Sequence, residues 1–444
     1  MKKFILSICI MVFFDSIKLI AQAPSDVKHP AWAASANMYE VNLRQFTPEG
    51  NIKAFMPHLK RLKDLGIDIL WFMPVTPIGV ENRKGGLGSY YSVKNYTEVN
   101  PEFGTMDEFK ELVKQAHSLD MKVIVDWVAN HSAWDNPWAA KHPDYYKKDS
   151  LGKFVSPWDW TDVIALNYEN KKLRKAMIEA MKFWVKETDI DGFRCDVAFL
   201  VPTDFWNEAR KALDKVKPVY MLAEAETPDL HEKAFDANYA WEIMHLLNKV
   251  AKNEEDIKKV KDYKLRNDSI FHPNVYRLAF VTNHDENSWN GTEFERFGEQ
   301  VQNFTTLLYT LHGQPLVYTG QEAGLNRRLS FFEKDSVVWD YLPYNNLIRR
   351  LLHLRHQEKA LWSGFEANQP KFYYNMPKGV LAYERNMSGS KVIVAINTGS
   401  IDISFTLPET GFYQNVLDEG TVALDPKHVI HLKPYQPIVL RLLH

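Results

Sequence analysis

Residues 191–197 read DGFRCDV, and the order of side chains in this stretch indicates a buried strand with one charged face. Successive side chains of a strand point to opposite faces, so Phe193 and Val197 share an apolar face while Arg194 and Asp196 share the other. Arg and Asp are almost never fully buried unless they are paired. We therefore expect Arg194 and Asp196 to belong to a charged site at the end of a core strand.

Seven further segments between residues 38 and 320 also have the character of buried strands, and amphipathic stretches typical of helices separate most of them. They read MYEVNL (38–43), GIDILWFM (66–73), MKVIVDWV (121–128), PVYMLAEAE (218–226), AFDANY (234–239), YRLAFVTNH (276–284) and QPLVYTG (314–320). Strands that alternate with helices predict parallel βαβ units, and eight such strands can close into a (β/α)8 TIM barrel. An open doubly wound sheet shows the same alternation and remains the alternative.

Two regions depart from this alternation. Residues 131–168 are rich in Trp, Pro, Asp and Lys and are too long for an ordinary connection, so we interpret them as a short functional insertion after the third strand. Residues 365–444 lose the helical periodicity and contain short apolar runs separated by turn residues, which predicts a C-terminal antiparallel β-sandwich domain. The barrel would then consist of residues 24–130 and 169–364.

The first 23 residues have the features of a signal peptide. Two lysines precede an apolar run, and Ala21-Gln22-Ala23 supplies a small-x-small cleavage site. A permanent anchor is the alternative, but Asp15 and Lys18 interrupt the apolar run, so we expect no stable membrane insertion. We expect a periplasmic or secreted protein, whose mature chain has Cys195 as its single cysteine and therefore no internal disulfide.

The charge balance limits the partners of the protein. The chain of 444 residues has 54 basic and 56 acidic side chains and a formal net charge of -2, which argues against nucleic acid as a partner and favours a neutral substrate. The 13 Trp, 20 Tyr and 25 Phe residues are mostly core, but aromatic faces with a polar edge also suit sugars. We expect the protein to be a monomer.

Polar residues stand at the carboxyl ends of four predicted strands, where parallel α/β barrels collect their reacting groups. They are Asp126 to His131 in DWVANH, Arg194 with Asp196, Glu224 in LAEAE, and His284 with Asp285 in VTNHDE. Taken singly, each acid could be a helix cap, and each His or Arg could be a satisfied core group. Together they favour function, because clustered carboxylates repel one another and a purely structural design would avoid them.

Two carboxylates with opposed roles and a third acid suit glycoside hydrolysis, in which one carboxylate attacks the anomeric carbon and a protonated one releases the leaving group. Metal-dependent hydrolysis is the competing use, but the chain has neither an H-E-x-x-H motif nor a Cys/His ligand spacing. The glycine-rich stretch RKGGLGSYY (83–91) lacks the helix onset and the Lys-Ser/Thr pair of a phosphate-binding loop.

The four segments DWVANH, GFRCDV, LAEAE and VTNHDE resemble, in order and spacing, the four motif regions of the α-amylase family, glycoside hydrolase family 13. TDVIALNYEN (161–170) resembles the additional region that follows the inserted domain of that family. The resemblance implies that Asp196 is the nucleophile, Glu224 the general acid/base and Asp285 the transition-state stabiliser. It also implies substrate-binding roles for the following residues: Arg194, His131, His284, Tyr91 and, as support, Asp126. Glu226 is the alternative acid.

The resemblance also bears on substrate and metal. It implies a retaining hydrolase that cleaves α-1,4 bonds of starch fragments or maltooligosaccharides through a covalent intermediate on Asp196. The VAFL that follows Asp196 puts Phe199 and Leu200 where many relatives have Lys-His, and Val197 is similar to the residue after the nucleophile in members that act on α-1,6 linkages or short oligosaccharides. An α-1,6- or oligosaccharide-specific glucosidase or transglycosylase is therefore an alternative, as is a non-catalytic carbohydrate-binding relative. Asn130 matches a residue that binds structural Ca²⁺ in many relatives.

The mechanism implies two measurable properties. The carboxyl groups of Asp196 and Glu224 should lie about 5 to 5.5 Å apart, as in retaining glycosidases. The pKa values of these two groups should diverge, because Glu224 must carry a proton when Asp196 is ionised, and the charge of Arg194 should keep Asp196 ionised.

Overall fold

The computed structural model describes residues 25–443, so the predicted signal peptide lies outside the described residues. Eight parallel strands close into a barrel in the order β1-β10-β9-β8-β7-β6-β3-β2. Their bounds are β1 Met38–Val41, β2 Ile69–Phe72, β3 Lys122–Trp127, β6 Gly192–Cys195, β7 Tyr220–Ala223, β8 Ala237–Tyr239, β9 Tyr276–Ala279 and β10 Gln314–Tyr318. Because β1 pairs with both β2 and β10, the predicted barrel is confirmed and the open sheet is excluded.

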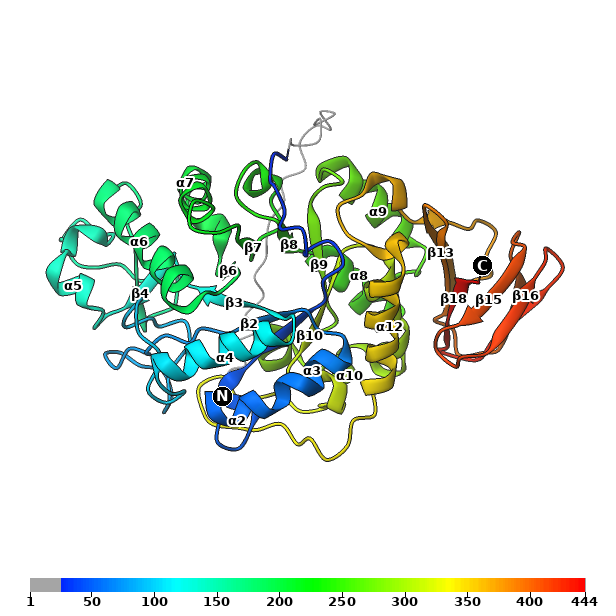
Figure 1. Ribbon diagram of the computed structural model, residues 1–444, viewed down its shortest axis with the longest axis horizontal. Coiled ribbons are helices and arrows are strands. Elements are labelled where there is room, and N and C mark those ends of the chain that lie inside the picture. The colour runs from blue at the N-terminus through cyan, green and yellow to red at the C-terminus, as the bar shows by residue number, and fades with distance from the viewer. Residues whose placement is uncertain (1–24, 444) are drawn as a thin grey trace.

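Helices surround the barrel (Figure 1). They are α1 Leu43–Phe46, α2 Ile52–Phe55, α3 Leu59–Leu65, α4 Met106–Ser118, α6 Lys171–Thr188, α7 Thr203–Leu213, α8 Trp241–Ala251, α9 Lys259–Ile270, α10 Glu293–Phe297, α11 Val301–Leu311 and α12 Asn345–Gln357. The start of α4 shows how the sequence sets a boundary: the Thr105 side chain accepts from Glu108 N, and the Glu108 side chain accepts from Thr105 N. Phe109 and Leu112 then lie on the buried face of that helix.

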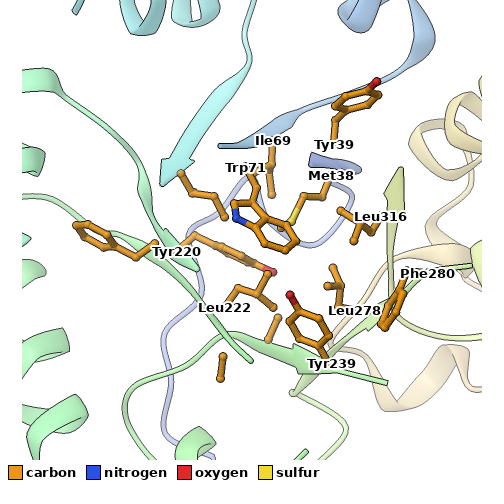
Figure 2. Close-up of a cluster of buried hydrophobic side chains, with 14 of the residues drawn as sticks. Met38, Tyr39, Ile69, Trp71, Tyr220, Leu222, Tyr239, Leu278, Phe280 and Leu316 are labelled. Carbon is orange, nitrogen blue, oxygen red and sulfur yellow. The ribbon is translucent and has the colours of Figure 1, made fainter. Parts of the chain in front are cut away.

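Side chains from the strands fill the interior of the barrel. Figure 2 shows Met38, Trp71, Leu222, Tyr239 and Leu316 approaching one another from five strands, and all of them are buried. Burial of large apolar side chains stabilises the fold by about 1.5–3 kcal/mol each, so this packed interior is a rigid base for groups at the strand ends.

The predicted inserted segment forms a small layer beside the barrel, at the left of Figure 1. Strand β4 (His131–Ala133) pairs antiparallel with β5 (Val163–Ala165), and α5 (Pro137–Lys141) lies between them in the chain. His131 is the first residue of β4, so this small sheet determines its position.

The C-terminal part is a β-sandwich, as predicted (Figure 1, right). Its six-stranded sheet has the order β11-β12-β13-β18-β15-β16, and β14 pairs with β17. The bounds are β11 Lys371–Phe372, β12 Val380–Met387, β13 Ser390–Asn397, β14 Ile403–Thr406, β15 Gly411–Asn415, β16 Thr421–Leu424, β17 Val429–Leu432 and β18 Pro437–Leu442. One face of the larger sheet joins the barrel core and the other packs against the β14–β17 pair.

All eight barrel strands are shorter than their predicted segments, and β9 and β8 are two examples. Strand β9 ends at Ala279, because β10 pairs with β9 only through Leu278 and Ala279. His284 and Asp285 therefore lie beyond the strand, at the start of the helical turn that continues through Glu286–Asn290. Strand β8 covers only Ala237–Tyr239 of the predicted 234–239. Within residues 25–443, no helix combines the length and the apolar character that a membrane crossing requires.

Candidate active site

The fully buried guanidinium of Arg194, on β6, connects three carboxylates at the mouth of the barrel. Its Nη1 lies 2.9 Å from Asp126 Oδ1 on β3 and 3.0 Å from Asp196 Oδ1, and its Nη2 lies 3.0 Å from Glu224 Oε1 after β7. Arg194 and Asp196 thus share a face, as the alternation predicts. The same face also receives Asp126 and Glu224 from the neighbouring strands.

Electrostatics explains how this buried cluster is tolerated. Burial alone lowers the pKa of Arg194, but the charges of Asp126 and Glu224 outweigh it, so the pKa lies well above the ordinary value and the side chain stays charged. A buried charge is costly unless it is paired, and breaking such a pair costs about 3–5 kcal/mol. Arg194 therefore holds the carboxylates together and supplies their counter-charge.

The pKa values of the two central acids differ in the predicted order. Burial raises the pKa of Glu224 to about 7, against the lowering effect of Arg194. Burial also raises the pKa of Asp196 to about 6, although Arg194 acts in the opposite direction. Arg194 thus favours the ionised form of Asp196, as predicted, but desolvation outweighs the charge of the guanidinium and leaves the pKa of this carboxyl above its ordinary value.

The backbone after β6 positions Glu224. Val197 has φ 37° and ψ 48°, in the left-handed region that a β-branched residue rarely adopts. This turn directs the Val197 N–H at Glu224 Oε2, which accepts it at 2.6 Å. Glu224 N in turn donates to the carbonyl oxygen of Cys195 at 3.0 Å. The loops that carry the two acids are thus bonded directly to each other.

Glu226, the alternative acid, lies outside this cluster. Strand β7 ends at Ala223, so the alternation that would place Glu226 on the face of Glu224 does not continue. Glu226 Oε1 instead lies 2.7 Å from Arg277 Nη2 and accepts from Glu242 N. Its contacts are those of an ion pair beside the site.

A second ion pair, between His284 and Glu40, borders the cluster. Glu40 lies on β1, is fully buried, and places Oε1 2.5 Å from His284 Nδ1. His284 Nε2 lies 2.8 Å from the Tyr91 hydroxyl and 3.3 Å from Asp285 Oδ2. Burial lowers the pKa of His284, but Asp285 and Glu40 raise it more strongly, to about 9. His284 is therefore a cation at neutral pH.

Glu40 is a site residue that the sequence analysis does not identify. Its signal is a carboxylate within MYEVNL, an otherwise apolar strand, and the partner that explains it is 244 positions away. A charged residue inside a core strand is informative in the same way as Arg194 in DGFRCDV.

Tyr91 comes from the loop between β2 and α4 and connects Asp126, in the Arg194 cluster, with His284. Its hydroxyl contacts Asp126 Oδ2 at 3.1 Å as well as His284 Nε2. Its ring stacks on His284, with centroids 5.5 Å apart, and on Phe331, with centroids 6.2 Å apart and an interplanar angle of 9°. Asp126 also accepts from Trp71 Nε1 at 3.3 Å, so it supports both Tyr91 and Arg194.

His131 differs from His284 in its charge. Burial lowers its pKa to about 3, so the imidazole is neutral. Its ring meets Trp160 edge to face, with centroids 5.4 Å apart. The two histidines thus offer different groups to a ligand: His131 a neutral hydrogen-bonding ring and His284 a cation.

The contacts of Asn130 bear on the predicted calcium site. Asn130 Nδ2 lies 3.1 Å from His131 Nδ1, and the residue opposite His131 in the β4–β5 ladder is Ala165. Asp162 is paired with Lys84 Nζ at 3.3 Å. Ca²⁺ takes 6–8 oxygen ligands, usually including carboxylates, and no group of three His, Cys, Asp or Glu side chains within residues 25–443 could hold a metal ion. The calcium prediction therefore has no support from this geometry.

Comparison with known proteins identifies the family of this chain. Residues 25–163 and 152–359 match the family model described as the alpha amylase catalytic domain. The chain belongs to the alpha-amylase family.

Two curated relatives show how far the alpha-amylase likeness extends. The chain is 26% identical to alpha-amylase MalA of Haloarcula japonica over 91% of its own length, and it spans 63% of the length of that protein. It is 25% identical to alpha-amylase 3 of Dictyoglomus thermophilum, with 93% of this chain and 94% of the relative covered. Among solved structures, the maltogenic alpha-amylase AmyB of Thermotoga neapolitana superposes with a TM-score of 0.83, at 29% identity over 92% of this chain and 99% of that chain.

Proposed function

We propose that the protein is a retaining α-glucan hydrolase that cleaves α-1,4 bonds of starch fragments or maltooligosaccharides. The observation that carries this proposal is that one buried guanidinium holds Asp196 and Glu224 while burial raises the pKa of Glu224 to about 7. Near neutral pH this pair can supply one ionised and one protonated carboxyl group, which double displacement requires. The names of the relatives, which include maltogenic amylases, support the substrate class.

In the first step Asp196 attacks the anomeric carbon. Arg194 binds Asp196 Oδ1, which orients the carboxylate and leaves Oδ2 to form the bond to carbon. Glu224 donates its proton to the glycosidic oxygen as the bond to the leaving group breaks. The product is a glycosyl ester on Asp196. In the second step Glu224, now ionised, takes a proton from water, and the resulting hydroxyl attacks the same carbon and releases Asp196.

The remaining groups stabilise positive charge and bind hydroxyls. Asp285 lies beside His284 at the mouth, with 39% of its side chain exposed, so its carboxylate can face the oxocarbenium-like transition state. His284 and His131 are suited to bind sugar hydroxyls, and the ring of Tyr91 provides an apolar wall beside them. Asp126 acts as a positioning residue through Arg194 and Tyr91.

The preference for α-1,4 over α-1,6 linkages is also part of this proposal. Phe199, which follows the nucleophile in a short 3-10 turn, exposes 52% of its surface and carries no charge for a leaving sugar. The uncharged residue at this position keeps the α-1,6- or oligosaccharide-specific glucosidase or transglycosylase as the second candidate. Export guided by residues 1–23 is proposed on the basis of their sequence alone.

The test is incubation of the mature chain and of its Asp196→Asn variant with maltoheptaose, pullulan and panose, with products and their anomeric form followed over time. Shorter α-anomeric products from maltoheptaose, made by the wild type alone, are the expected result. Products longer than the substrate would favour the transglycosylase, and preferential cleavage of panose at its α-1,6 bond would favour the second linkage. Absence of turnover by either protein would favour the non-catalytic binding relative.

A further inference from the structure

Asp285, the acid assigned to the transition state, is held differently from the other two acids. Asp196 and Glu224 are each bound by the guanidinium of Arg194. In the described part of the chain, the one close polar partner of the Asp285 carboxylate is its chain neighbour His284, whose Nε2 lies 3.3 Å from Oδ2. The position of Asp285 therefore depends on the backbone that carries it.

One buried side chain, Arg296 on α10, binds both ends of that backbone. Its Nη2 donates to the carbonyl oxygen of Val281, and its Nε donates to that of Gly291 at 3.0 Å. We call residues 282–290, which lie between these two carbonyl groups, the Asp285 segment. Arg296 exposes 9% of its surface, so these hydrogen bonds are shielded from bulk water. A single guanidinium thus ties the start of the segment to its end.

Hydrogen bonds inside the Asp285 segment connect these two ends to the acid. Glu286 N donates to Asn283 Oδ1 at 2.8 Å, and this bond spans Asp285. Gly291 N donates to the carbonyl oxygen of Glu286 at 2.9 Å. Residues 286–290 form a π-type helical turn, a geometry that is rare overall and frequent at functional sites. A shift of either end of the segment therefore displaces the Asp285 carboxylate.

Arg296 is itself fixed by its own helix and by α8. Its backbone N–H donates to the Thr292 carbonyl oxygen at 3.0 Å, in the turn that the Thr292–Glu295 capping box begins. Nη1 donates to Met244 Sδ on α8 at 3.3 Å, and the guanidinium carbon lies 4.7 Å from the centroid of the Phe297 ring. The planar guanidinium has five donors in a fixed arrangement, so it can hold two carbonyl oxygens at once. A lysine, which has a single nitrogen, cannot replace both bonds in this geometry.

We infer that Arg296 is a positioning residue for Asp285: it fixes the Asp285 segment so that the carboxylate faces the sugar when positive charge develops there. This inference rests on the proposed function and adds a residue to it. The attraction between a carboxylate and an oxocarbenium-like centre falls with distance, and a misplacement of about 1 Å can cost about 10²-fold in rate. The loss should appear in kcat more than in KM, because the charge develops only in the transition state.

The first test is Arg296→Lys, which keeps the charge but cannot make both carbonyl bonds. On maltoheptaose we expect kcat to fall by between about 10-fold and 10²-fold, with KM changed by less than about threefold. Arg296→Gln, which buries no charge, is the second variant and should show the same division between kcat and KM. Urea titration of each variant establishes that it is folded under the assay conditions.

A double-mutant cycle with Asp285→Asn separates positioning from a general structural role. The cycle uses α-maltosyl fluoride, whose good leaving group keeps weak variants measurable. Because Arg296 acts through the Asp285 carboxylate, Arg296→Lys should change kcat by less than about twofold in the Asp285→Asn background. Equal losses of kcat in the two backgrounds, or a wild-type kcat in both Arg296 variants, would overturn the positioning role.

The matched control is Arg355→Lys on α12. Arg355 is also buried, and its two Nη atoms donate to the carbonyl oxygens of Leu361 and Ala34. Ala34 precedes β1, at the end of the barrel away from the mouth. This variant should lose stability, as Arg296→Lys does, and keep the wild-type kcat; a matching fall in kcat would also overturn the inference while leaving the proposed function standing. Absence of maltoheptaose hydrolysis by the wild type would refute the proposed function and the inference with it.

Discussion

Replacing Glu40 by Gln tests whether the buried acid on β1 controls the charge of His284. The change preserves the shape of the side chain and a hydrogen-bond acceptor for His284 Nδ1, but it removes a negative charge 2.5 Å from that atom. At an effective dielectric constant of about 20, two unit charges roughly 3 Å apart interact by about 5.5 kcal/mol. Measured pKa shifts from a close opposite charge are smaller, about 1–3 units, because the surroundings relax.

In the native site, burial lowers the pKa of His284, and Asp285 and Glu40 raise it to about 9. Without Glu40, Asp285 is the remaining close carboxylate, so we expect the pKa of His284 in Glu40→Gln to fall to between about 6 and 8. The imidazole would then lose its proton within the neutral range. Sugar binding at pH 8 should weaken accordingly, because a neutral ring donates one hydrogen bond fewer.

The assay is an NMR titration of protein labelled with ¹⁵N in histidine, with the His284 signal assigned by its loss in His284→Gln. Glu293→Gln is the matched control: Glu293 is a buried acid on α10 whose neighbouring charge is Arg296. It should leave the His284 titration in place. If His284 still titrated near 9 in Glu40→Gln, the assignment of Glu40 as its counter-ion would be wrong.

Three further predictions concern the charged cluster. Glu224→Gln should lower kcat on maltoheptaose by about 10²–10⁴-fold and have far less effect on α-glucosyl fluoride, whose leaving group needs no proton; equal losses on both substrates would contradict the acid role. The pH profile of wild-type kcat/KM should be a narrow bell, because the Asp196–Glu224 pair has apparent pKa values of about 6 and about 7; a plateau from pH 5 to 9 would contradict this. Arg194→Met should destabilise the fold by about 3–5 kcal/mol in urea titrations. Burial raises the folded-state pKa values of Asp196 and Glu224, so their contribution to stability is present below the ordinary carboxyl pKa and is lost as the pH rises. At pH 8 both acids are ionised and depend on the charge of Arg194. The loss of stability in Arg194→Met should therefore be larger at pH 8 than at pH 5.

The local pattern of the sequence is sufficient to predict the eight barrel strands. Each strand lies within a short, mostly apolar run between polar turns, a signal that is contained in neighbouring residues. The same holds for Arg194 and Asp196, because alternation along one strand places both on one face. The side chains of Asp126, Glu224 and Asp285 can be predicted to lie close together, because each follows or ends a strand and the carboxyl ends of parallel barrel strands lie at one mouth.

What the sequence alone does not determine is the set of partners and the balance of energies within the site. The contact of Glu40 with His284 joins residues 244 positions apart, and no local pattern encodes such a pair. Desolvation also depends on the complete packing, so only the tertiary structure shows that burial outweighs the guanidinium and raises the pKa of Asp196. The stacking of Phe331 on Tyr91 likewise arises where two long loops meet. The alternation of side chains and the positions of the strand ends therefore determine which residues reach the site. The packing of the closed barrel and its loops determines which groups each of these residues contacts.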